Sequence, residues 1–265
     1  SHTFLRSGVR EGGTLVAQAG AKASVIGRVD LWFDEAGVVV RSEARHVDLY
    51  DEPGPDSRNE RVDALSAALT ERAAGRMNDV VGVLGAPLGV TRRELVNGSA
   101  GNFITDVMRE RTGAEIAIHN RGGIRTSLAA GAVTRRDLFM MLPFSNHLET
   151  LTLDGTVVPE LFRRSIESQR RGGLEFSGVT LEVELTGGKP RLVRVVLEGG
   201  GELAPDAEVR LTTNSFLGAG GDGWEILAAA ASREVDFVVL RDMLEAAFAG
   251  GARTPDEGSR YRVLR

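Results

Sequence analysis

Cysteine is absent from the sequence, and so is any long apolar run. Without cysteine the chain has no disulfide framework, no thiolate nucleophile and no cysteine-ligated zinc or iron–sulfur site. No segment reaches the roughly 18 apolar residues that a membrane-spanning helix needs. The first residues, Ser1-His2-Thr3, show neither the basic region nor the apolar segment of a secretory signal. We therefore expect no membrane span, and either a cytoplasmic chain or a true start that lies upstream.

Lysine is nearly absent too, because Lys22 and Lys189 are the only lysines among the 32 cationic residues. Arginine can bind phosphate through two parallel hydrogen bonds, but a GC-rich genome produces the same bias, and we attribute most of the arginines to that. The net charge of −5 argues against nucleic acid as a partner, because neutralising its backbone takes a broad basic surface. A small molecule is the expected partner.

The N-terminal part of the sequence predicts a small β-rich segment. Alternating apolar residues favour strands at 14–20 and 26–40, the second with a turn at 34–37. A stretch rich in proline, glycine and charge at 51–57 is the best linker candidate. An amphipathic helix is expected at 59–78. We place the boundaries at residues 1–55, 56–80 and 81–265.

The rest of the chain mixes helical and strand periodicities, as in an α+β fold. We expect helices from about Ala100 to Gly113, from Thr134 to Pro143 and at 158–168, strands at 115–119, 147–155 and 208–217, and a hairpin turning at 186–190.

Three loops carry residues suited to binding a ligand. Asn120 to Arg125 follows a strand and contains two glycines that let the backbone approach a ligand. Pro143 to Asn146 sets an aromatic ring beside an amide. Asn214 to Gly223 is so rich in glycine that Asp222 must be held by the backbone, and its carboxylate can accept both hydroxyls of a ribose. Taken singly, each loop is also compatible with an ordinary turn, and Phe144 with a core position.

The third loop also satisfies the dinucleotide-binding pattern, with glycines at 218, 220 and 223 and Asp242 after a further strand. Two points argue against that interpretation. Asp222 would put a negative charge where a pyrophosphate must lie, and no second βαβ half follows.

Taken together, these segments resemble the C-terminal domain of the 5′-nucleotidase family, which includes UDP-sugar hydrolases and 2′,3′-cyclic-nucleotide phosphodiesterases. The resemblance covers residues from about Gly85 to the end. It rests on five motifs in register: Ser99 to Asn102 leading to Asp106, the Asn-x-Gly-Gly-x-Arg loop, the Pro-Phe-x-Asn turn, Phe176-Ser177-Gly178, and Asn214 to Gly223.

The resemblance implies roles for particular residues. In the family two aromatic rings clamp the base, and the matching positions are Phe144 and Phe216. The ribose-binding aspartate matches Asp222. The remaining expected pocket residues are Arg125 on the phosphate side, Asn120 and Asn146 in the lining, and a second phosphate arginine at Arg93 or Arg92, where the spacing to Asn102 is longer than usual.

The first residues resemble the end of the family's metallophosphatase domain, with His2 as one metal ligand and strands like those at 15–20 and 27–31. The other ligands, which bridge two divalent ions (Mn, Mg, Zn or Ca), would lie in a missing N-terminal half. We interpret His46, His119 and His147 as structural, and a disordered terminus is the plain alternative for His2.

Two hypotheses follow from the resemblance. In the first, the parent protein is a metal-dependent nucleotide phosphohydrolase, periplasmic or extracellular, and this chain supplies nucleotide binding but is inactive alone. In the second, the chain is a non-catalytic nucleoside-binding module. The sequence does not choose among nucleoside monophosphates, UDP-sugars and cyclic nucleotides, and related thiosulfohydrolases share parts of the architecture.

Overall fold

The computed structural model describes residues 4–20, 25–49, 59–91, 93–167, 173–228 and 230–264, and these form two compact units, Ser1–Glu71 and Arg72–Arg265. The predicted linker at 51–57 and the expected ligand position His2 lie outside the described residues. Each unit is considered by itself below.

Two antiparallel hairpins make up most of the first unit. β1 (Phe4–Glu11) pairs with β2 (Thr14–Ala19), and β3 (Val25–Phe33) pairs with β4 (Val39–Asp48). The predicted turn at 34–37 is confirmed, and the Asp34 carboxylate fixes it by accepting the amides of Ala36 and Val38 at 3.0 and 2.8 Å. β1 was not predicted.

Helix α1 (Glu60–Met77) lies where the two units meet in the sequence, and it confirms the predicted helix. Asn59 begins it, because its side chain accepts the backbone amides of Arg61 and Val62. The apolar stripe forms, but Val62, Leu65 and Leu69 are exposed, so α1 buries none of its residues.

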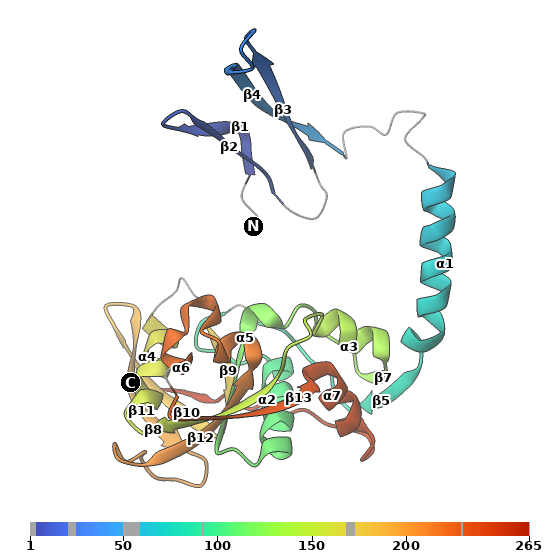
Figure 1. The fold of residues 1–265 in the computed structure, drawn as a ribbon. Coiled ribbons are helices and arrows are strands. Elements are labelled where there is room, and N and C mark those ends of the chain that lie inside the picture. Colours follow the sequence, from blue (N-terminus) through green and yellow to red (C-terminus); the bar gives the residue numbers. More distant parts are fainter. Residues whose placement is uncertain are drawn as a thin grey trace. The chain divides into compact units, whose positions relative to one another are not determined.

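A five-stranded mixed sheet is the centre of the second unit (Figure 1). Its order is β13 (Ser232–Val239), β8 (His147–Asp154), β12 (Glu208–Asn214), β6 (Ile116–Asn120) and β9 (Leu174–Ser177). β12 and β6 run parallel and the other neighbours antiparallel. This confirms the α+β class.

Both faces of this sheet are covered. One core cluster joins it to α2 (Ser99–Thr112), α3 (Arg135–Met141) and α7 (Leu240–Phe248). The other joins it to α4 (Val157–Glu167) and to a second sheet of β11 (Lys189–Leu197), β10 (Val179–Thr186) and β14 (Tyr261–Val263). β6 shows the layering, because Ala117 belongs to the first cluster while Ile116 and Ile118 belong to the second.

Several predicted boundaries are confirmed. Thr134 forms a capping box with Asp137 at the start of α3, and Gly113 ends α2 in the left-handed conformation, with φ 64°. The β10–β11 hairpin turns at Gly187 and Gly188 as expected. The short pair β5 (Val80–Leu84) and β7 (Gly131–Thr134) was not predicted.

One predicted strand is too long. β12 ends at Asn214, and Ser215–Gly218 forms a short helix, α5, where the sequence suggested a strand to residue 217. The reason is local: the Asn214 side chain accepts the Leu217 amide at 3.0 Å and caps the helix. A 3₁₀ turn (Gly221–Gly223) and α6 (Glu225–Ala228) follow.

Candidate nucleotide-binding pocket

Sheet topology brings three separate loops to one edge. β6 and β12 are adjacent and parallel, so the residues that follow their carboxyl ends, after Asn120 and Asn214, meet at the same edge. β8 runs antiparallel to β12, so its first residue, His147, and the preceding Asn146 reach that edge as well.

A pocket of about 310 Å³ lies there, lined by Asn120, Gly122, Gly123, Arg125, Phe144, Asn146, Phe216 and Asp222. The structure thus brings together six of the seven residues that the sequence assigned to substrate binding. Ligand pockets in proteins typically start at about 300 Å³, so this one suits a small molecule.

Two phenyl rings in the pocket are exposed. Phe144 is 49% and Phe216 41% exposed, whereas Phe162 and Phe176 in the core are fully buried. The alternative that Phe144 is a core residue is therefore wrong. Arg241 supports the Phe144 loop by donating to the Phe144 carbonyl at 3.3 Å and to Ser145 Oγ at 3.2 Å. An exposed phenyl ring costs hydrophobic free energy unless a ligand covers it.

A chain of amide hydrogen bonds orients the carboxylate of Asp222. Asn214 donates to Asn120 Oδ1 at 3.0 Å, and Asn120 Nδ2 donates to Asp222 Oδ2 at 3.2 Å. The Asp222 backbone lies in the left-handed region, with φ 55°. The expectation that backbone alone holds Asp222 is thus incomplete, because Asn120 also holds its side chain.

The two predicted phosphate arginines differ in position. Arg125 lines the pocket, and its Nη1 donates to the Gly122 carbonyl at 2.9 Å. Its guanidinium forms no ion pair among the described residues. Arg93 is exposed and does not line the pocket; its carbonyl accepts a hydrogen bond from Arg121. Arg92, its alternative, lies outside the described residues.

Sequence reasoning missed a buried ion pair behind the pocket, between Arg121 and Glu175. Burial raises the pKa of Glu175, while the Arg121 guanidinium acts in the opposite direction. The two residues lie far apart in the sequence: Arg121 follows β6, whereas Glu175 lies in β9. Nothing in the local pattern distinguishes them from surface charges.

No group of three or more histidine, aspartate or glutamate side chains placed to hold a metal ion occurs among the described residues. His119 is buried, and burial lowers its pKa to about 4. His147 lies 3.5 Å from Glu149, and His46 contacts the Gln18 carbonyl. The described residues therefore include no such group, and His2, the one ligand that the resemblance places in this chain, lies outside them.

The dinucleotide alternative does not match the fold. Its three glycines lie across α5 and the 3₁₀ turn that carries Asp222, and Asp242 lies in the first turn of α7.

Among the helices that the structure describes, none combines the length and the hydrophobicity that crossing a membrane requires.

Comparison with known proteins identifies related chains. The family model for the 5′-nucleotidase C-terminal domain matches residues 75–229. The trifunctional nucleotide phosphoesterase YfkN of Bacillus subtilis is 32% identical over 88% of this chain and 17% of its own length. A 5′-nucleotidase of Vibrio vulnificus is 29% identical over 89% of this chain and 46% of its own. This chain thus spans less than half of either relative.

A solved structure agrees with these sequence matches. The 5′-nucleotidase precursor of Thermus thermophilus superposes with a TM-score of 0.69 at 25% identity, over 95% of this chain and 52% of its own. The chain therefore belongs to the family of the 5′-nucleotidase C-terminal domain.

Proposed function

We propose that this chain is the nucleotide-binding part of a metal-dependent nucleotide phosphohydrolase of the 5′-nucleotidase type. One observation carries the proposal: two exposed phenyl rings and an oriented carboxylate line the same small pocket. Both named relatives are described as nucleotide phosphoesterases or nucleotidases.

Each part of a nucleotide has a matching group in the pocket. Phe144 and Phe216 stack on the base, and stacking on an aromatic ring tolerates any base because every base has a π-face. The Asp222 carboxylate accepts the two ribose hydroxyls. Arg125, which has no carboxylate partner among the described residues, is available to a phosphate.

The hydrolytic chemistry would come from a second domain. Divalent ions held by that domain would supply an activated water for attack on phosphorus. We assign this chain the task of holding the nucleotide and presenting its phosphate, because the described residues contain no group that would hold such ions. We place the whole protein in the periplasm or outside the cell, by analogy with the family.

The first unit fits the end of such a second domain. β3 and β4 leave Val29, Leu31, Phe33 and Val40 exposed. A two-stranded hairpin is marginally stable by itself and is normally covered by further structure. We infer that the remaining strands of a metallophosphatase domain cover these side chains.

Binding of adenosine to this chain, measured by calorimetry, tests the proposal. Phe144→Ala and Phe216→Ala should each weaken binding by about 1–3 kcal/mol through loss of stacking. Phe237→Ala is the matched control, because Phe237 is 82% exposed and does not line the pocket. Wild-type affinity in both pocket variants, with circular dichroism showing them folded, would overturn the assignment.

A further inference from the structure

Arg121 lies in the pocket loop but faces away from the pocket. Its neighbours Asn120 and Gly122 line the cavity, whereas its own side chain is 7% exposed and pairs with Glu175, which is 3% exposed, at 3.0 Å. A buried ion pair loses the hydration of both charges, and additional hydrogen bonds must offset that loss. The partners of this pair therefore indicate its role.

Four additional hydrogen bonds of the pair go to one segment, residues 93–98. Arg121 donates to the carbonyls of Arg93 and Val96 at 2.8 and 2.7 Å. Glu175 Oε2 accepts from Asn97 Nδ2 and from the Gly98 amide, both at 3.3 Å. The cation binds the carbonyls and the anion binds the N–H groups, so one ion pair fixes both kinds of polar group in the segment.

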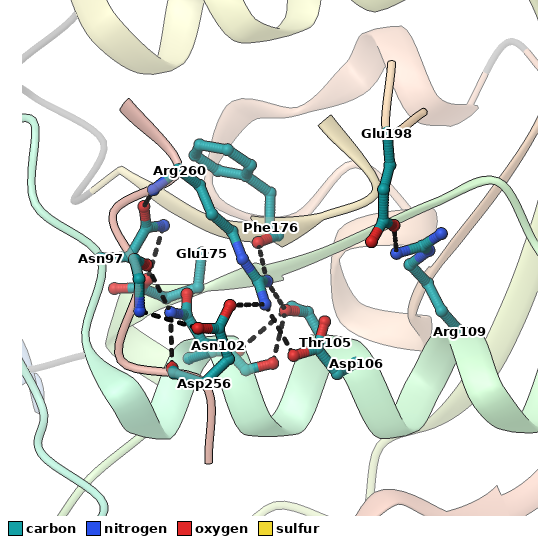
Figure 2. Close-up of polar contacts among 12 residues, drawn as sticks. Asn97, Asn102, Thr105, Asp106, Arg109, Glu175, Phe176, Glu198, Asp256 and Arg260 are labelled. Atoms are coloured by element: carbon teal, nitrogen blue, oxygen red, sulfur yellow. Dashed lines mark hydrogen bonds and ion pairs between the residues drawn. The ribbon is translucent and has the colours of Figure 1, made fainter. Parts of the chain in front are cut away.

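Glu175 is itself held from two further sides. Figure 2 shows Asn97 between Arg260 and Glu175, and the Arg260 amide donates to Asn97 Oδ1 at 3.1 Å. Gly101 in the first turn of α2 lies so close that a Cβ there would collide with the Glu175 side chain. These neighbours restrict the position of the carboxylate.

The fixed segment has an unfavourable backbone conformation. Leu95 has φ 52°, and Asp222 in the pocket is the only other non-glycine residue with a positive φ among the residues that the structure describes. A branched side chain disfavours this region, and such a conformation persists only where surrounding contacts impose it. Here the contacts of Arg121 and Glu175 flank Leu95 on both sides.

The segment begins with an arginine that is available to an anion. Arg93 is exposed, and its guanidinium forms no ion pair within the described residues. Most other arginines of the second unit are neutralised by carboxylates, as Arg135 is by Asp79 and Glu245.

We propose that Arg121 is a positioning residue: together with Glu175 it fixes residues 93–98, the segment that carries Arg93, the arginine that the family resemblance assigns to the phosphate. This inference rests on the proposed function. A purely structural role is the competing explanation, because Gly98 is the N-cap of α2 and has no side-chain cap of its own, and a carboxylate at a helix N-terminus stabilises the helix.

The two roles differ in which ligand they affect. Calorimetry on this chain gives the dissociation constants of adenosine and of adenosine 5′-monophosphate, and their ratio is the preference for phosphate. Arg93→Met should lower this preference by about tenfold or more, the loss expected for a hydrogen bond to a charged group. Arg121→Met/Glu175→Met, which leaves no unpaired buried charge, should lower it by about tenfold with adenosine affinity nearly unchanged.

Three further variants serve as a combined variant, a replacement variant and a control. Adding Arg93→Met to the paired variant should cause no further loss of preference, because both changes remove the same contact. Glu175→Gln keeps the shape of the side chain and replaces the paired variant if that variant does not fold. It should change the preference for phosphate in the same direction. Arg194→Met is the matched control: Arg194 pairs with buried Glu182 at 2.7 Å, away from the pocket, so its loss should lower thermal stability without changing the preference.

The outcomes distinguish failure of the proposed function from failure of the positioning role of Arg121. If the wild-type chain binds neither ligand, the proposed function fails, and this inference fails with it. If the wild-type chain prefers the monophosphate and the folded variants keep that preference, only the positioning role is overturned. Equal weakening of both ligands also overturns it, because Arg121 would then support the pocket as a whole.

Discussion

Asp222 shows how the pocket turns an unfavourable residue conformation into an oriented functional group. Its positive φ follows from the glycine-rich turn, and Asn120 fixes one of its carboxylate oxygens. Asparagine tolerates the left-handed region as well as aspartate does. A substitution by asparagine therefore removes the charge while keeping the fold.

Asp222→Asn should weaken adenosine binding by about 1.5–3 kcal/mol, the range for hydrogen bonds to a charged group, and should weaken adenine binding much less. Calorimetry with both ligands measures the difference. Asp242→Asn, whose side chain is exposed on α7, controls for the change in net charge. Equal losses for adenine and adenosine would show that Asp222 only shapes the loop.

His119 makes the stability of the second unit dependent on pH. Burial lowers its pKa to about 4, and its Nδ1 lies 2.9 Å from the Asn120 carbonyl. In the unfolded chain His119 takes up a proton near pH 6.5, whereas in the folded chain it does so only near pH 4. The contribution of His119 to the free energy of unfolding is therefore present above about pH 6.5 and is lost as pH falls towards about 4.

Between about pH 7.5 and 4.5 this residue should lower the free energy of unfolding by about 2–3 kcal/mol. Urea unfolding at both pH values, for the wild type and for His119→Gln, separates the contribution of His119 from that of the carboxylates, because the carboxylates titrate in both proteins. The variant should lose less stability over this range. Identical losses in the two proteins would mean that the fold does not lower the pKa of His119.

At the scale of elements, α5 and the following 3₁₀ turn act as a support for one aromatic ring. A Cβ at Gly221 would lie 2.5 Å from the Phe216 carbonyl and 2.6 Å from its ring. No side chain fits there unless Phe216 moves. The glycines of this loop therefore serve the placement of the ring as well as the turn.

Gly221→Ala should displace the Phe216 ring and weaken adenosine binding by about 1–3 kcal/mol, as removal of the ring does. Gly250→Ala is the matched control, because a Cβ at Gly250 makes only an ordinary contact, at 3.8 Å. Calorimetry on both variants makes the comparison. Unchanged affinity in Gly221→Ala would show that the ring need not be held at this position.

Elements with a clear local signal were predictable from the sequence. The Thr134 capping box, the Gly113 helix end and the β10–β11 turn each depend on residues within a few positions of one another. The pocket residues were predictable because the loops that bear them have local signals: two follow strands, and the third follows a helix that Pro143 ends. Their convergence depended on the family resemblance, since pairing of β6 with β12 joins residues far apart in the chain.

Other features lacked such a signal. β9 is four residues long and fully buried, too short to show a period of two. Residues 215–217 looked like the continuation of a strand, although the side chain of Asn214 caps a helix there. Arg121 and Glu175 were indistinguishable from surface charges, because burial of a charged pair is decided by tertiary structure.

At the scale of the whole molecule, we propose that nucleotide binding and hydrolysis belong to different domains. The second unit contains the entire candidate pocket. The first unit leaves apolar strand residues exposed, and the chain covers less than half of its named curated relatives. We therefore expect the chain to bind a nucleotide without converting it.

The chain alone should release no phosphate from adenosine 5′-monophosphate in the presence of Mn²⁺, Mg²⁺ or Zn²⁺, because two-metal catalysis requires a complete set of ligands. Co-expression with the N-terminal half of the parent protein should restore phosphate release. A colorimetric phosphate assay measures both. The control is Phe144→Ala/Phe216→Ala purified in the same way, since a contaminating phosphatase would be equally active in both preparations. Activity of the wild-type chain that disappears in this variant would contradict the prediction, because catalysis would then depend on the pocket of this chain and require a metal site within it.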